Sequence, residues 1–185
     1  MYTAPVPRVF LAPLGPLLLV LHALVAVVLG GAGVHQAVLA VRILRGRAVS
    51  PRLLRVYSLV AALAYAATLL TGGLLYPRYR YFVRGLQLDR DAPWAANLFD
   101  FKENLATLGL PLAVGTLILA SGVAGLRAAP ARAGSSAAGR DDAGAAQPEL
   151  VRPIRWIYGF LALGTAAVSL FNVIAGLIVT GVRGG

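Results

Sequence analysis

The sequence predicts an all-α integral membrane protein, a four-helix bundle in which every helix crosses the bilayer. The 185 residues are 58% hydrophobic and only 13% charged, whereas soluble domains are about 45–50% apolar and about 25% charged. Four apolar stretches reach the roughly 20 residues that a helix needs to cross the hydrocarbon core. The spans and their connections account for the whole sequence, so we expect one transmembrane domain over 1–185.

The first three spans begin at residues that are typical of helix starts. Pro16 suits the first turn of the first span, which carries no charge until Arg42 and is far longer than the roughly 7–15 apolar residues of a removable signal peptide. Ser50 before Pro51 is a candidate N-cap for the second span. Asp100 and Glu103 have the spacing of a capping box before the third. The predicted spans are about 16–44, 56–76, 104–126 and 156–182.

The fourth span follows a connection of different composition. Residues 127–150 are small, polar and repetitive, which is typical of a flexible linker. Trp156 and Tyr158 then mark the headgroup level at which the fourth span begins. The second connection, 77–103, alternates aromatic and basic residues before it gains acids. It is interpreted either as a short amphipathic helix in the interface or as a functional loop over the helix ends.

The charge distribution indicates a lipid partner and an orientation. The net charge is +10, with 17 basic residues in short segments between apolar runs. This is not the basic face of a nucleic-acid-binding protein, so we expect anionic lipid headgroups as partners and no nucleic acid. Five arginines and no acid occupy 42–55. The positive-inside rule therefore predicts cytoplasmic 42–55 and 127–155, with both termini extracytoplasmic. Richness in Ala, Gly and Arg suggests a GC-rich bacterial source, and hence the bacterial inner membrane.

Several kinds of chemistry are excluded by the residues that are missing. There are no cysteines, so disulfides, thiolate nucleophiles and Cys-ligated metals are excluded. No Walker, HExxH, GxSxG or dinucleotide motif occurs, which disfavours an enzyme without deciding the question. Gly30, Gly31 and Gly33 form a small-residue patch that allows close helix packing. The leading interpretation is a small subunit or scaffold of a membrane complex, assembled with other membrane subunits or as a homo-oligomer.

Three ionisable residues are the candidate cofactor-binding residues. His22 and His35 lie within the first span, where ionisable groups are costly and usually functional. Thirteen residues along a helix separate them by about 19.5 Å and roughly 140°, so they cannot share one metal ion. Lys102, at the predicted start of the third span, opposes the helix dipole. The alternative function is therefore haem b or metal binding, in electron transfer or porphyrin chemistry. Each histidine could instead be a neutral group bonded to a neighbouring helix.

The first span also carries a family resemblance. The run from Leu21 to Ala26, followed by Gly30-Gly31, resembles the first helix of CopD-like copper-resistance membrane proteins and of HemJ-type protoporphyrinogen oxidases. The resemblance implies a four-helix, haem-associated membrane protein in which His22 and Lys102 match an early-helix histidine and a later lysine. The HemJ-type tryptophan is missing from 27–29. The connection 76–104 is more similar to that of uncharacterised bacterial inner-membrane proteins.

Overall fold

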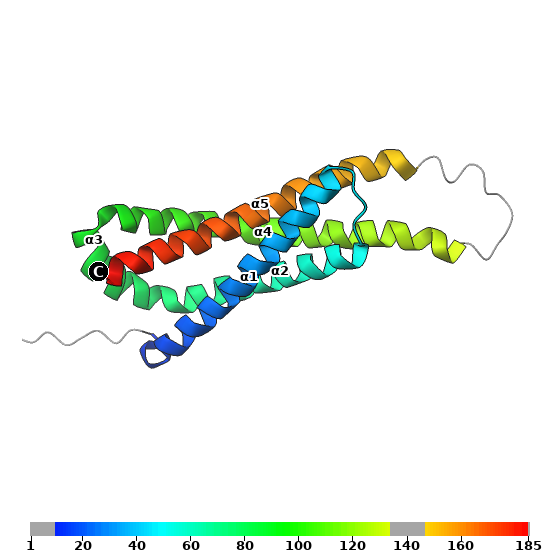
Figure 1. The fold of residues 1–185 in the computed structure, drawn as a ribbon. Coiled ribbons are helices and arrows are strands. Elements are labelled where there is room, and N and C mark those ends of the chain that lie inside the picture. Colours follow the sequence, from blue (N-terminus) through cyan, green and yellow to red (C-terminus); the bar gives the residue numbers. More distant parts are fainter. Residues whose placement is uncertain (1–9, 134–146, 185) are drawn as a thin grey trace, which may run out of the picture.

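The computed structural model describes residues 10–133 and 147–184, and this part of the chain is helical and without strands, which confirms the predicted fold class. Four long helices form a bundle (Figure 1). They are α1 (Gly15–Leu44), α2 (Pro51–Arg78), α4 (Pro93–Ala133) and α5 (Gln147–Gly184). A 3₁₀ turn, η1 (Ala12–Leu14), precedes α1, while a π-helical segment, η2 (Tyr79–Leu88), and the short α3 (Asp89–Asp91) continue α2.

The helices pack as a four-cornered bundle. Helix α1 packs against α2 and α5, and α4 packs against the same two helices from the other side. Helix α1 runs obliquely, so that its first turns diverge from the other helices (Figure 1). The α2–α4 turn and the C-terminal end of α5 lie at one end, and the α1–α2 connection lies at the other (Figure 1). All four long helices are long and apolar enough to cross a membrane, so the chain is a multi-pass membrane protein.

Small residues fill the inside of this bundle, and large apolar residues face outward. This is the pattern expected in a bilayer, because lipid is as apolar as leucine and helices associate through close backbone packing. Alanines with no exposed surface lie where the helices meet, and leucine, valine and isoleucine side chains with more than half of their surface exposed face outward. The alanines are Ala40, Ala61, Ala113, Ala120 and Ala162, and the outward residues include Leu24, Val27, Leu63, Ile118 and Leu177.

The second connection is more helical than the sequence predicted. Helix α2 starts at Pro51 with Ser50 at the N-cap position, although the Ser50 side chain makes no capping hydrogen bond. Beyond Pro77, which cannot donate a backbone hydrogen bond, the helix widens into η2. The turn to α4 is confined to Ala92, which has φ −148° and ψ 66°.

Helix α4 accordingly begins at Pro93 and not at 104. The capping box predicted from Asp100 and Glu103 is therefore wrong, because both residues lie inside the helix. Asp100 instead accepts a hydrogen bond of 2.6 Å from Arg84 of η2. The linker predicted for 127–150 falls mainly on 134–146, outside the described residues; on either side, α4 continues to Ala133 and α5 begins at Gln147.

Candidate functional site

A cavity of about 330 Å³ lies between the four long helices, near the end that holds the α2–α4 turn. Each long helix contributes to its wall, which is the usual way that helix bundles build cofactor sites. Apolar residues make most of the surface, and polar groups interrupt it at a few places. The polar side chains in the wall come from His22 of α1, Tyr65, Thr68 and Tyr76 of α2, Lys102, Glu103 and Thr107 of α4, and Ser169 and Asn172 of α5.

The His22 imidazole is hydrogen-bonded to α2. Its Nδ1 lies 3.0 Å from the Thr71 hydroxyl oxygen. That hydroxyl has a single proton, which it donates to the α2 backbone, with the Ala67 carbonyl at 2.8 Å and the Thr68 carbonyl at 3.2 Å. When the hydroxyl proton is directed to the backbone, Thr71 accepts from Nδ1, and this tautomer leaves the Nε2 lone pair available. Metal-ligating histidines are commonly fixed in this way, by a hydrogen bond from their other nitrogen.

Gly72 leaves the space that the imidazole occupies. A Cβ atom at this position would lie 3.2 Å from Cε1 of His22, which is tighter than an ordinary van der Waals contact. The ring therefore packs against the backbone of α2. We infer that the glycine and Thr71 together set the position of the imidazole in the wall.

Lys102 and Glu103 bring charge to the opposite side of the same cavity. The Lys102 ammonium lies 4.9 Å from the centre of the Phe99 ring, a cation–π contact. The ion pairs that Arg84 makes with Asp89 and Asp100 include neither Lys102 nor Glu103. Because α4 starts at Pro93, Lys102 is not at a helix start, and the dipole argument made from the sequence is wrong. Its place in the cavity wall is the reason that the structure gives for it.

Asn172 adds a polar atom that has no partner in the described structure. Its amide nitrogen donates to the Val168 carbonyl at 2.8 Å, while its buried Oδ1 has no hydrogen-bond partner. A buried acceptor without a donor costs free energy, so it usually indicates a bound water or ligand. The sequence showed Asn172 only as a polar residue at membrane depth. Its spacing from Ser169 and Thr165 on one face of α5 is the signal that places it toward the interior.

The structure places His35 away from this cavity. Its side chain is exposed, its Nδ1 donates to the Gly31 carbonyl at 2.9 Å, and its ring stacks on Tyr57 with centroids 4.9 Å apart. His22 and Lys102 thus share a site that His35 does not join. Within the described residues no three His, Asp or Glu side chains gather as a metal site.

A second polar cluster lies deeper in the bundle. The Gln36 amide nitrogen donates to the Ser58 hydroxyl at 3.2 Å, and that hydroxyl lies 3.5 Å from the Tyr158 hydroxyl. All three side chains are buried and come from α1, α2 and α5. The Gln36 Oε1 atom has no hydrogen-bond partner in the described structure. The cluster therefore links three helices through weak bonds and leaves one acceptor unsatisfied.

Comparisons of the chain with protein-family models, with curated proteins and with solved structures gave no match. The likeness of the first span to CopD-like and HemJ-type proteins therefore stays a prediction.

Proposed function

We propose that this membrane protein binds haem b in the cavity between its helices, with His22 as the iron ligand, and works in electron transfer or porphyrin chemistry. His22 and Lys102 support this proposal because they come from different helices and yet line one cavity. The imidazole offers an unprotonated Nε2, and the ammonium offers a partner for a propionate.

The side chains in the cavity wall have the chemistry that haem b needs, with an imidazole for the iron and an ammonium for a propionate. Its volume of about 330 Å³ is at the low end of the range for ligand sites. It is not closed on all sides, so a large planar ligand is not confined to this volume. The chain's only other histidine, His35, is outside it. A sixth iron ligand would therefore be a non-histidine group or come from another subunit.

Each polar residue then has a separate task. His22 holds the iron, Thr71 keeps the imidazole in the Nδ1–H tautomer, and Lys102 neutralises a carboxylate. Asn172 presents an acceptor to a donor on the ligand or to a water beside it. Haem b bound in this way would supply one-electron chemistry.

The absorption spectrum of the purified protein tests this proposal. We expect a Soret band that is lost in His22→Ala and kept in the matched variant His35→Ala. Thr71→Val should weaken haem retention by about 10–100-fold, the usual effect of removing the partner of a metal ligand. Thr180→Val is its control, because the Thr180 hydroxyl donates to its own helix, far along α5. A colourless protein without metal, purified after growth with a haem precursor, would refute haem binding.

A second candidate function is that of a small subunit or scaffold, and the outer face of α1 favours it. A Cβ atom at Gly30 or at Gly31 would meet nothing within 4 Å. His35, one turn along from Gly31, is exposed at membrane depth, where polar groups are costly. Small residues that surround a polar one favour a partner helix, from another membrane subunit or a second copy.

Cysteine crosslinking can test this face cleanly, because the chain has no cysteine of its own. We expect Gly31→Cys to give a disulfide-linked product in oxidised membranes, and Leu63→Cys, on the outward face of α2, to give none. A chain that stays monomeric in mild detergent and crosslinks equally from both positions would argue against the subunit interpretation.

We further propose a bacterial inner-membrane location with the α1–α2 connection in the cytoplasm. Among the residues whose side chains are described, that end carries arginines and no acid, whereas the other end carries both signs of charge. Reporter fusions should therefore show position 48 inside and position 90 outside. The reverse pattern would invert the orientation without affecting either proposed function.

A further inference from the structure

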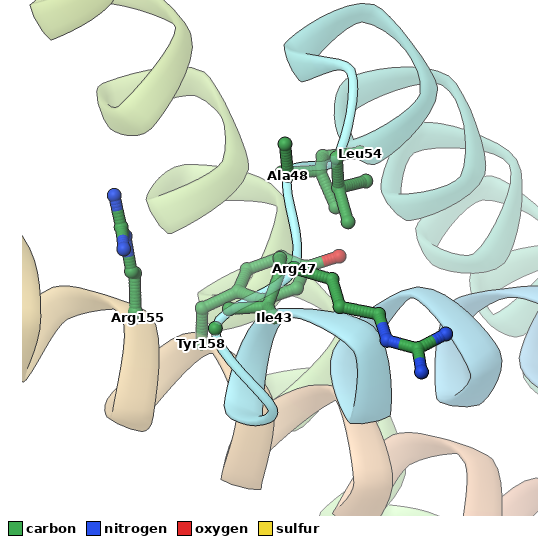
Figure 2. Close-up of a pocket in the computed structure, with 8 residues that line it drawn as sticks. Ile43, Arg47, Ala48, Leu54, Arg155 and Tyr158 are labelled. Atoms are coloured by element: carbon green, nitrogen blue, oxygen red, sulfur yellow. The ribbon is translucent and has the colours of Figure 1, made fainter.

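The second cavity of the bundle lies at the opposite end from His22 and has a different chemistry. Its volume is about 140 Å³, and it is formed where the α1–α2 connection meets α5. Figure 2 shows Arg155 beside Tyr158 on one side of it and Ala48 and Leu54 on the other, while the Arg47 side chain extends away from Arg155. Ile43 and Leu54 supply apolar wall. The cavity is thus small and partly apolar, and two arginines from different segments belong to its wall.

The charge around this cavity has one sign among the described side chains. The acids whose side chains are described are Asp89 and Asp91 of α3 and Asp100 and Glu103 of α4, all at the end of the bundle that holds the α2–α4 turn. The three acids of the third connection lie outside the described side chains. The ion pairs of Arg84 with Asp89 and Asp100 also lie at the end that holds the α2–α4 turn. The arginines with described side chains at the end that holds the α1–α2 connection are Arg42, Arg45, Arg47, Arg52, Arg55 and Arg155.

Backbone donors add to this positive field. After α1, the N–H groups of Arg45, Gly46 and Arg47 bond to α1 carbonyls at 3.0, 2.9 and 2.9 Å, and Gly46 has a φ of +72°. The next backbone bond of the described connection is from Leu54 to Ser50. The N–H groups of Ala48 and Val49, both in the cavity wall, are therefore not used by the described backbone. The N-terminus of α2, with its own unpaired N–H groups, follows directly.

We infer that this cavity binds the phosphate headgroup of one anionic phospholipid. Arg155 would pair with the phosphate, the exposed Arg47 side chain would turn toward it, and the backbone N–H groups of Ala48 and Val49 would donate to it. A lipid is the occupant that the position favours, because the cavity lies where the candidate membrane spans of α1, α2 and α5 begin or end, and headgroups are expected at the ends of spans. Basic pockets between transmembrane helices are a recurrent way of binding anionic headgroups. A volume of about 140 Å³ also suits a headgroup better than a larger polar ligand.

This site is independent of the proposed haem site, since it shares no residue with the His22 cavity. It differs from a general attraction to anionic membranes in two ways. It predicts a defined stoichiometry of one lipid per chain, and it predicts that two named arginines matter more than the other exposed arginines.

Native mass spectrometry of the full-length, delipidated protein tests the inference, with phosphatidylglycerol and phosphatidylcholine as probes. We expect one saturable phosphatidylglycerol per chain and no comparable phosphatidylcholine adduct. The Arg47→Gln/Arg155→Gln variant should weaken phosphatidylglycerol binding at least about tenfold, since charge-assisted hydrogen bonds are lost. Arg90→Gln, which removes an exposed arginine at the end that holds the α2–α4 turn, is the matched control and should bind like the unmodified protein.

Three results would overturn the inference. The two lipids could bind equally, or Arg90→Gln could weaken binding as much as the double variant, which would mean unspecific charge attraction. Alternatively, glycerol phosphate or inorganic phosphate could displace the lipid at equal concentration, which would make free phosphate the ligand. If the double variant does not fold, Arg155→Gln alone gives the same comparison, because its side chain is exposed.

Discussion

Gly109 of α4 lies against Tyr65 of α2, and replacing this glycine tests the packing of the bundle directly. A Cβ atom at Gly109 would overlap the hydroxyl oxygen and the ring of Tyr65. The Tyr65 side chain is 2% exposed and lines the His22 cavity, so it cannot move outward. We expect Gly109→Ala to destabilise the protein and to push the ring toward the cavity.

The size of the effect follows from two opposing contributions. Forcing an extra methyl group into a packed interior costs about 1–3 kcal/mol. Alanine is better than glycine inside a helix by about 1 kcal/mol. The net loss is therefore up to about 2 kcal/mol. For a chain of this length it corresponds to a fall in Tm of up to about 8 °C.

Thermal unfolding in detergent, followed by circular dichroism, measures this loss. Gly122→Ala is the matched control in the same helix, because a Cβ atom at Gly122 meets nothing within 4 Å, and it should be neutral or slightly stabilising. In a Tyr65→Leu background, Gly109→Ala should cost less, since the overlapping ring is gone. The prediction is wrong if Gly109→Ala and Gly122→Ala have the same Tm. It is also wrong if Gly109→Ala lowers the stability by the same amount in the Tyr65→Leu background.

Three other substitutions have expected outcomes. Ser58→Ala leaves the buried Gln36 amide without its acceptor and should lower the free energy of unfolding by about 1 kcal/mol. Gln36→Met removes an oxygen that already has no partner, so it should be neutral or stabilising. Denaturant titration measures both, and a Gln36→Met protein less stable than Ser58→Ala would contradict the prediction. Arg84→Gln removes the hydrogen bond that ties η2 to Asp100 of α4 and should cost about 0.5–1 kcal/mol, because the pair is partly exposed. Hydrogen exchange in 79–91 should then quicken, and no change relative to Arg90→Gln would contradict this role.

The spans were predictable because a bilayer sets one length and one polarity for every helix that crosses it. Residues 77–103 were not, because their pattern depends on a partner distant in sequence. Aromatic and basic residues there indicate an interface, yet Val83 and Leu88 are buried with Phe99 against Val179 of α5. No local pattern shows that the end of α5 covers this turn, so its helical continuation became visible only in the fold.

The candidate site was likewise predictable only where it depends on residues close together in the sequence. The angle between His22 and His35 follows from helix geometry, and the structure accordingly places one in the cavity wall and the other on an exposed face. Glu103 was misread, because its spacing from Asp100 matches a capping box wherever a helix happens to begin. Its position in the cavity depends on the start of α4 at Pro93, which the aromatic residues after it obscured.

The unsatisfied polar atoms bear on whether these residues serve packing or function. In a bundle selected for stability alone, Gln36 and Asn172 could be apolar residues of similar size, since an apolar replacement removes a buried acceptor at little cost. Asn172 lies in the wall of the His22 cavity, and Gln36 is bonded through Ser58 toward Tyr158 in the wall of the cavity that Arg47 and Arg155 help to line. Buried polar atoms without a hydrogen-bond partner are expected at functional sites. Their association with the two cavities, at opposite ends of the bundle, therefore favours a ligand at each end over a purely structural role.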